Sequence, residues 1–122
     1  MLFRSVSPYT SDESPPVPAL YRLRLGTGPA MIRELVAGGV ENLQVRYGVF
    51  QTDSTARYLA ADQISGTDWD AVKSAQVWLL MRASLPEPGY TNNNTYTMGT
   101  QNMTFPDNYP RLLLSAVVNL RN

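Results

Sequence analysis

The sequence predicts a mainly β protein built on an antiparallel sheet of four to six strands, with helical turns that are short at most. Two long runs near the end of the chain, residues 75–84 and 111–122, alternate apolar and polar side chains as strands do. Gly and Pro residues divide the rest of the chain into further short segments. Each predicted strand has an apolar face, so the sheet needs a covering layer. The sequence contains no strong candidate for that layer.

The N-terminal part predicts a linker followed by a hairpin. Residues 1–18 are rich in proline and predict a loop-like entry segment, and residues 19–122 predict the domain. Ala19–Leu25 alternates and predicts a strand that ends at the turn 26–29. Residues 30–36 fit a second strand or one helical turn, and their length favours the strand because so short a helix is marginal. Gly38 and Gly39 then interrupt this segment.

The middle of the chain predicts one clear strand and several turns. Residues 41–50 alternate and predict a strand, and residues 51–54 are polar and predict a turn. Residues 58–64 have a helix-leaning composition and leave their structure open. Residues 67–73 predict a single helical turn, with Thr67 or Asp68 as the side chain that caps its free amides. Trp69 and Val72 would then lie on one side of this turn and close the edge of the core.

The long connection 85–110 holds four prolines and three consecutive asparagines. A connection of this length in a compact domain is usually functional or poorly ordered. The strand before it carries Trp78 on the face opposite Val77 and Leu79, which predicts a central strand covered on both sides. The predicted core consists of the apolar side chains that alternate along the strands, together with Trp69: Leu43, Val45, Tyr47, Trp69, Val77, Trp78, Leu79, Leu112, Leu114, Val118 and Leu120.

Composition argues against several classes of function. Ten basic residues balance ten acidic ones, and the basic residues are scattered, so we expect no nucleic-acid partner. The chain has no Cys and no His, which removes thiol chemistry, Ser–His nucleophiles and the commonest metal ligands. No stretch of about 18 apolar residues and no signal peptide is present, so this chain as given carries no membrane span or export signal. No cofactor is expected.

A few residues could still carry chemistry, and each has a more ordinary interpretation. Asp68 and Asp70 could act as a carboxylate pair, but beside Trp69 at the start of a turn they more often cap it. Asp107, Asn108 and the asparagines 92–94 offer oxygen ligands for calcium, although a solvated turn-forming loop is the more frequent outcome. Trp78 could be a sugar-binding platform, but a place in the sheet is favoured.

Several blocks of the chain, in order, resemble PilW-like minor pilins of type IV pili. They are residues 34–48 (ELVAGGVENLQVRYG), 69–72 with 77–84, 86–91 with Tyr96, 107–111, and the terminal 118–122 (VNLRN). Together these blocks span roughly residues 19–122. The family's defining prepilin cleavage site and long apolar helix are not in this sequence, so the chain resembles the C-terminal sheet region, a pilin-like head without its N-terminal helix.

The resemblance implies a structural rather than an enzymatic role. In this family the missing helix anchors the subunit in the inner membrane, later packs in the pilus core, and lies over the sheet. The full-length protein would then belong to the inner membrane, periplasm and pilus, with other minor pilins and the major pilin as partners. We expect the exposed sheet edges and the connection 85–110 to contact neighbouring subunits, through the candidate loop residues Pro86, Gly89, Tyr90, Tyr96, Asp107 and Tyr109. An uncovered apolar face would also favour self-association of this chain.

Two other functions compete with this interpretation. A pseudopilin of a type II secretion system has the same architecture, and the upstream coding sequence would distinguish the two. A β-sandwich module that binds carbohydrate through Trp69, Trp78 and tyrosines is the alternative from another class.

Overall fold

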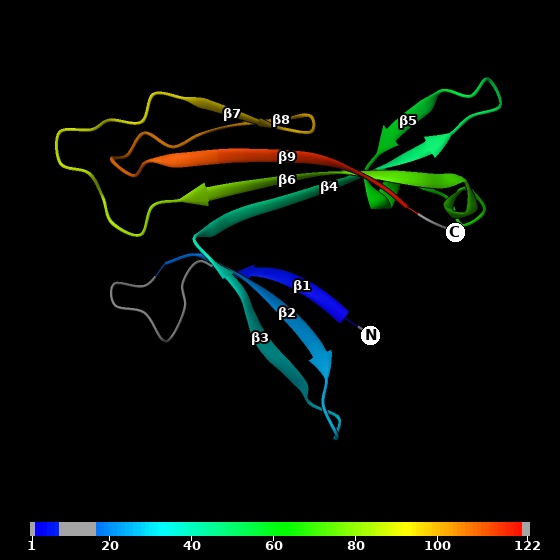
Figure 1. Cartoon of the computed structure of the whole chain (residues 1–122), viewed down its shortest axis with the longest axis horizontal. Coiled ribbons are helices and arrows are strands. Elements are labelled where there is room, and N and C mark those ends of the chain that lie inside the picture. Colours follow the sequence, from blue (N-terminus) through cyan, green and yellow to red (C-terminus); the bar gives the residue numbers. More distant parts are fainter. Residues whose placement is uncertain (1, 8–16, 121–122) are drawn as a thin grey trace.

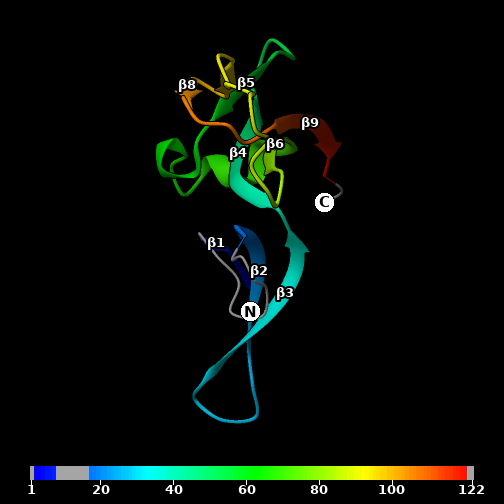
Figure 2. The same ribbon diagram turned by 90° about the vertical axis from the view of Figure 1, so that its left-hand side faces the viewer.

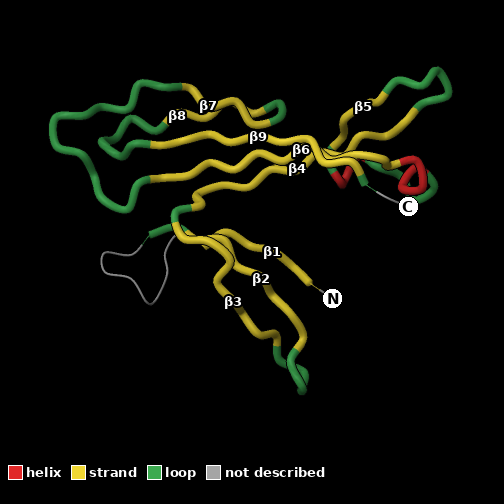
Figure 3. The backbone as a smooth tube through the Cα atoms, viewed as in Figure 1, coloured by secondary structure: helices red, strands yellow, loops and turns green. Residues whose placement is uncertain are grey.

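The computed structural model describes residues 2–7 and 17–120, and these form a mainly β protein, as predicted. The described strands make a three-stranded sheet, a four-stranded sheet and a two-stranded hairpin. Figure 1 shows the three-stranded sheet set apart from the long strands of the four-stranded one. The tube view in Figure 3 shows that helix is confined to two short turns. No helix among the described residues is long and apolar enough to cross a membrane.

The smaller sheet is antiparallel in the order β1-β2-β3. It consists of β1 (Leu2–Ser7), β2 (Ala19–Leu25) and β3 (Met31–Gly38). The predicted strands at Ala19–Leu25 and 30–36 are confirmed, the second extending to Gly38. The prediction of a loop over residues 2–7 is wrong, because this stretch pairs along β2 from end to end. The rest of the entry segment up to residue 16 lies outside the described residues.

The larger sheet has the order β5-β4-β6-β9, with antiparallel neighbours throughout. Its strands are β4 (Val40–Phe50), β5 (Ala56–Leu59), β6 (Val72–Arg82) and β9 (Arg111–Asn119). The three long strands predicted from alternation are therefore confirmed, and β6 is central. Between β3 and β4 a single residue, Gly39, turns the chain from one sheet into the other with a φ of +84°. Figure 2 shows the two sheets one above the other, joined at this bend.

Two 3₁₀ turns, η1 (Ala61–Gln63) and η2 (Asp68–Ala71), connect β5 to β6. The ambiguous segment 58–64 therefore divides between the end of β5 and η1. The helical turn predicted at 67–73 is confirmed, but its predicted Thr67 cap is wrong, because that side chain makes no capping hydrogen bond. The carboxylate of Asp68 instead accepts a hydrogen bond from the Ser65 hydroxyl at 2.7 Å.

The connection 85–110 contains a hairpin that the sequence did not predict, β7 (Thr95–Met98) paired with β8 (Gln101–Thr104). Gly99 occupies the two-residue turn with a φ of +64°, which suits glycine at the first position of a type II′ turn. This hairpin lies over one face of the larger sheet. There Leu80 of β6 packs with Tyr96 and Met98 in a cluster bordered by half-buried Trp78. A second cluster, of Val49, Ile64 and Val72, closes the other end of the sheet.

The predicted core is largely wrong in its burial. Trp69 is 41% exposed, and Leu112, Leu114 and Val118 are 58%, 47% and 46% exposed. Leu120 is exposed as well, while the remaining predicted core residues are only half-buried: Leu43, Val45, Tyr47, Val77, Trp78 and Leu79. The physical reason is that alternation reveals which side chains share a face but not whether another layer covers it. Among the described residues, the hairpin covers only one face of the larger sheet.

Candidate functional site

One face of the larger sheet is uncovered over much of its area and carries apolar side chains. The strand register places Leu43, Val45 and Tyr47 of β4 opposite Leu79, Val77 and Ala75 of β6, and directly paired residues share a face. The register of β6 with β9 adds a third row in the same way. We call this surface, without the buried Ala75, the open face: Leu43, Val45, Tyr47, Val77, Leu79, Met81, Leu112, Leu114, Ala116 and Val118.

The open face is apolar over three adjacent strands. A shallow groove of about 250 Å³ runs between β6 and β9 and is lined by Val77, Leu79, Leu114, Ser115 and Ala116. At the β4 end the ring of Trp69 meets the ring of Tyr47 edge-on, with their centroids 5.1 Å apart. Removing apolar surface from water is favourable in proportion to its area. Contiguous exposed apolar patches are typical of surfaces that bind a partner, so this face is the candidate site.

The hairpin covers the opposite face over β6 and leaves Val117 of β9 57% exposed, which corrects the prediction that β6 is buried on both sides. Trp78 lies on this covered face beside Leu80, and Phe105 and Met103 pack against the same cluster. The two tryptophans offered for a sugar-binding surface thus lie in different surroundings, Trp78 in the hairpin cluster and Trp69 beside Tyr47. The structure does not bring them together into one platform.

An ion cluster fixes the C-terminal end of the long connection. Arg111, whose side chain is only 2% exposed, donates to Glu41 at 2.8 Å and to Asp107 at 2.7 Å. Its guanidinium also lies 4.1 Å from the centroid of the Phe105 ring. The hydrogen bond from Arg111 lowers the pKa of Asp107. Burial disfavours the charge of Arg111, but its hydrogen bonds to Asp107 and Glu41 outweigh burial and raise its pKa.

The candidate loop residues separate into an exposed group and a structural group. Residues 84–89 are all exposed and include Pro86 and Gly89, and Tyr90 after them is half-buried. Tyr96 is buried, and its hydroxyl accepts a 3.0 Å hydrogen bond from Asn92. Asp107 belongs to the ion cluster, and Tyr109 lies under the guanidinium of Arg82 at 4.2 Å. We call the exposed stretch 84–89 the loop tip.

Two of the residues proposed as calcium ligands, Asp107 and Asn92, have other partners for their side-chain oxygens. Both carboxylate oxygens of Asp107 accept hydrogen bonds from Arg111. The side-chain oxygen of Asn92 accepts from the backbone amide of Asn94 at 3.0 Å. Within residues 2–7 and 17–120, no three acidic residues are grouped so that they could hold a metal ion.

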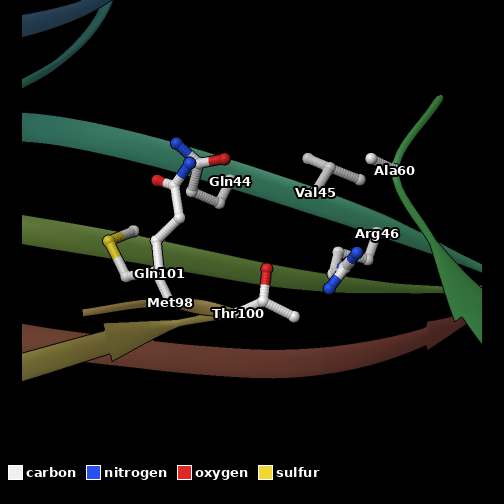
Figure 4. A pocket seen from close by; sticks show the side chains of 8 residues that line it. Gln44, Val45, Arg46, Ala60, Met98, Thr100 and Gln101 are labelled. Carbon is white, nitrogen blue, oxygen red and sulfur yellow. The ribbon is translucent and has the colours of Figure 1, made fainter. Parts of the chain in front are cut away.

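One small polar cavity lies beneath the turn of the β7–β8 hairpin. Figure 4 shows its lining, to which Gln44 and Arg46 of β4 and Thr100 and Gln101 of the hairpin contribute. The cavity measures about 90 Å³, and its lining residue Arg46 donates to the side-chain oxygen of Gln63 at 3.3 Å. Its lining contains no carboxylate, hydroxyl–base pair or other arrangement for acid–base catalysis.

Sequence reasoning missed the residues that hold the covered face together. Leu80, Met98 and Tyr96 are the best-buried members of that face, and only the short alternation of Tyr96 and Met98 with threonines signalled a strand there. Arg111 begins the predicted strand 111–122, and no local pattern connects it with Glu41.

Comparison with known protein families gives a match over most of the chain. A family model described as Type IV Pilus-assembly protein W matches residues 8–122 of the chain. No curated protein and no solved structure gives a significant match.

Proposed function

The chain belongs to the PilW family of type IV pilus-assembly proteins, and on that premise we propose that it is a structural minor pilin. Membership of this family connects the chain with pilus assembly and therefore with the cell envelope. In the proposed role it helps to prime the fibre and is incorporated at or near the tip, together with other minor pilins and the major pilin. Its work is protein contact and not catalysis.

The open face is the observation that carries this proposal. It extends over β4, β6 and β9 and exposes Leu112, Leu114 and Val118 to water. An α-helix with an apolar stripe fits a three-stranded apolar surface of this kind, because helices bury that stripe by packing against sheets. We propose that the apolar N-terminal helix of a minor pilin lies on this face.

A second contact surface in the proposed role is the loop tip (84–89). Leu85 within it is 58% exposed, at the end of the sheet where β6 leaves and β9 enters. The backbone amide of Glu87 donates to the carbonyl of Asn108 at 2.8 Å, so the tip is held in place against the end of the connection. An exposed apolar side chain on a fixed loop is suited to binding a neighbouring subunit.

The open face is tested in a strain that makes pili with this protein. Leu79→Asp places a charge at the middle of the face, and its control Thr52→Asp places the same charge in the exposed turn after β4. We expect loss of surface pili and of this protein from sheared fibres with Leu79→Asp, and normal assembly with Thr52→Asp. Normal piliation by a stably produced Leu79→Asp protein would refute the proposal.

The loop tip is tested by co-purification with other minor pilins. Leu85→Ser removes the exposed apolar side chain. The packing of Tyr96 on the covered face and the ion pairs of Arg111 do not involve Leu85, so the substitution leaves them in place. We expect reduced recovery of the other minor pilins with Leu85→Ser, with Thr52→Ser as the matched control. Equal recovery with both variants would exclude the tip as a contact with those subunits.

A further inference from the structure

The last strand of the larger sheet has a free edge. β9 pairs with β6 on one side and is the outermost strand in the order β5-β4-β6-β9. Figure 1 shows β9 extended along the whole length of β6. The β7–β8 hairpin forms a sheet of its own and does not pair with β9. Among the described residues, therefore, no strand occupies the outer side of β9.

The two ends of β9 show which of its backbone groups face outwards. The carbonyl of Pro110 accepts from the amide of Ala83, and the amide of Leu120 donates to the carbonyl of Lys73. Even-numbered residues of β9 thus direct their backbone groups towards β6, and the register runs from one end to the other without a bulge. Backbone groups alternate in direction along an antiparallel strand. The outward groups are accordingly those of Arg111, Leu113, Ser115, Val117 and Asn119.

This edge has none of the usual protection against pairing. Proteins shield edge strands with charges, prolines or bulges, because a row of free N–H and C=O groups pairs readily with another strand. Residues 112–118 contain no charged residue and no proline. Their side chains are exposed except for half-buried Leu113, and Leu112 and Val117 are more than half exposed.

The strand is also self-complementary about Ser115. In an antiparallel pair of two β9 strands centred there, Leu114 lies opposite Ala116, Leu113 opposite Val117, and Leu112 opposite Val118. In this register the odd-numbered residues of one copy, whose backbone N–H and C=O groups face outwards, lie opposite the odd-numbered residues of the other copy. Their backbone groups can therefore form the hydrogen bonds of an antiparallel pair. Arg111 lies opposite Asn119, so no like charges meet.

We infer that the edge of β9 binds the β9 edge of a second copy of this chain, as an antiparallel pair with its twofold axis at Ser115. The pairing joins the two larger sheets into one, and it aligns the open faces of both copies on the same side. An identical copy fits better than an acidic or basic strand because residues 112–118 offer no charge for such a partner to neutralise. The inference stands apart from the pilus role, since it needs only the geometry of β9.

Substitution of the central residue tests the pairing. Ser115→Pro removes an amide that faces outwards, so it spares the hydrogen bonds to β6 while blocking the edge. Leu79→Ser is the matched control because Leu79 lies on the open face but one strand away from the edge. Analytical ultracentrifugation of the 122-residue chain over a concentration series gives the dissociation constant of the dimer, and circular dichroism verifies that each variant is folded.

We expect Ser115→Pro to weaken dimerisation at least tenfold and Leu79→Ser to change it little. A chain that is monomeric at every concentration would overturn the inference. So would a dimer that Leu79→Ser abolishes and Ser115→Pro preserves, because that pattern means stacking of open faces.

Disulfide trapping tests the register independently. The chain has no Cys, so Ser115→Cys introduces a single thiol. At the twofold axis the two Cα atoms of a hydrogen-bonded pair would lie about 5.5 Å apart, within the range that a disulfide spans. We expect rapid oxidation of this variant to a covalent dimer, and much slower oxidation of Thr52→Cys in the turn after β4. Equal rates for the two variants would overturn the proposed register.

Discussion

Arg111 and Glu41, seventy positions apart in the sequence, are joined by two hydrogen bonds of 2.8 and 3.2 Å between guanidinium and carboxylate. The contact ties the first residue of β9 to the second residue of β4, with β6 between the two strands. Asp107 completes the cluster from the end of the long connection. One nearly buried cation thus ties the end of the long connection to β4.

Removing that cation should destabilise the protein substantially. Arg111→Met keeps the length of the side chain but leaves two carboxylates without their partner. Loss of one partner of a buried ion pair costs about 3–5 kcal/mol, and about 2 kcal/mol is expected here because Glu41 and Asp107 retain some access to water. Urea unfolding followed by circular dichroism measures the change.

The exposed ion pair of the smaller sheet provides the control. Arg22 and Glu34 lie opposite each other on β2 and β3, and the side chain of Arg22 is largely exposed. Exposed ion pairs contribute little to the free energy of unfolding, because water and salt screen the attraction between their charges. Arg22→Met should therefore change the midpoint of unfolding much less than Arg111→Met. Similar losses from the two variants would contradict a special role for the buried cluster.

The same cluster predicts a dependence of stability on acid pH. The hydrogen bond from Arg111 lowers the pKa of Asp107 in the folded protein below its ordinary value. A lowered pKa means that the ionised carboxylate stabilises the fold. That stabilisation is present above the ordinary Asp pKa of about 3.9 and is lost as the pH falls from there through the lower folded-state value.

Asp107→Asn should therefore flatten the acid side of the stability curve. At neutral pH the variant should be less stable than the wild type, and the difference should shrink as the pH is lowered through and below about 4. Glu34 and Asp53, whose pKa values are also lowered, are present in both proteins and cancel in the comparison. Thermal unfolding across a pH series tests this. A constant difference at all pH values would refute it.

The sequence predicted the fold well wherever a strand is long enough to show its period. The alternation of β2, β4, β6 and β9 gave their positions within a few residues. The hairpin of β7 and β8 escaped prediction because each strand has four residues, in a stretch dominated by Asn and Thr. β1 escaped because the prolines that follow it dominate the composition of residues 1–18.

The candidate site was predictable in its composition but not in its exposure. Leu112, Leu114 and Val118 share a face by their spacing alone, so the sequence identified the apolar row. Whether a row is covered depends on residues far along the chain, such as Met98 over Leu80 on the other face. The pairing of Arg111 with Glu41 is unpredictable for the same reason, since no local pattern links residues of two non-neighbouring strands.

The bend between the two sheets requires a glycine at position 39. Its φ of +84° is strained for any residue with a side chain, and an added Cβ would lie 3.3 Å from the carbonyl oxygen of Arg82. Gly39→Ala should cost about 1–2 kcal/mol. Gly28→Ala is the control because nothing lies within 4 Å of its Cβ position. Equal unfolding midpoints for the two variants would show that the bend tolerates a side chain.

Finally, the two faces of the larger sheet should respond differently to truncation. Leu80 is fully buried beneath the hairpin, so Leu80→Ala should cost about 2–5 kcal/mol through lost burial and a cavity. Leu114 is 47% exposed on the open face, so Leu114→Ala should cost less than about 1 kcal/mol in this chain. The open-face variant should also bind less of a dye that reports exposed apolar surface. Chemical unfolding and dye titration measure both effects, and a large loss of stability from Leu114→Ala would mean that the chain itself covers this face.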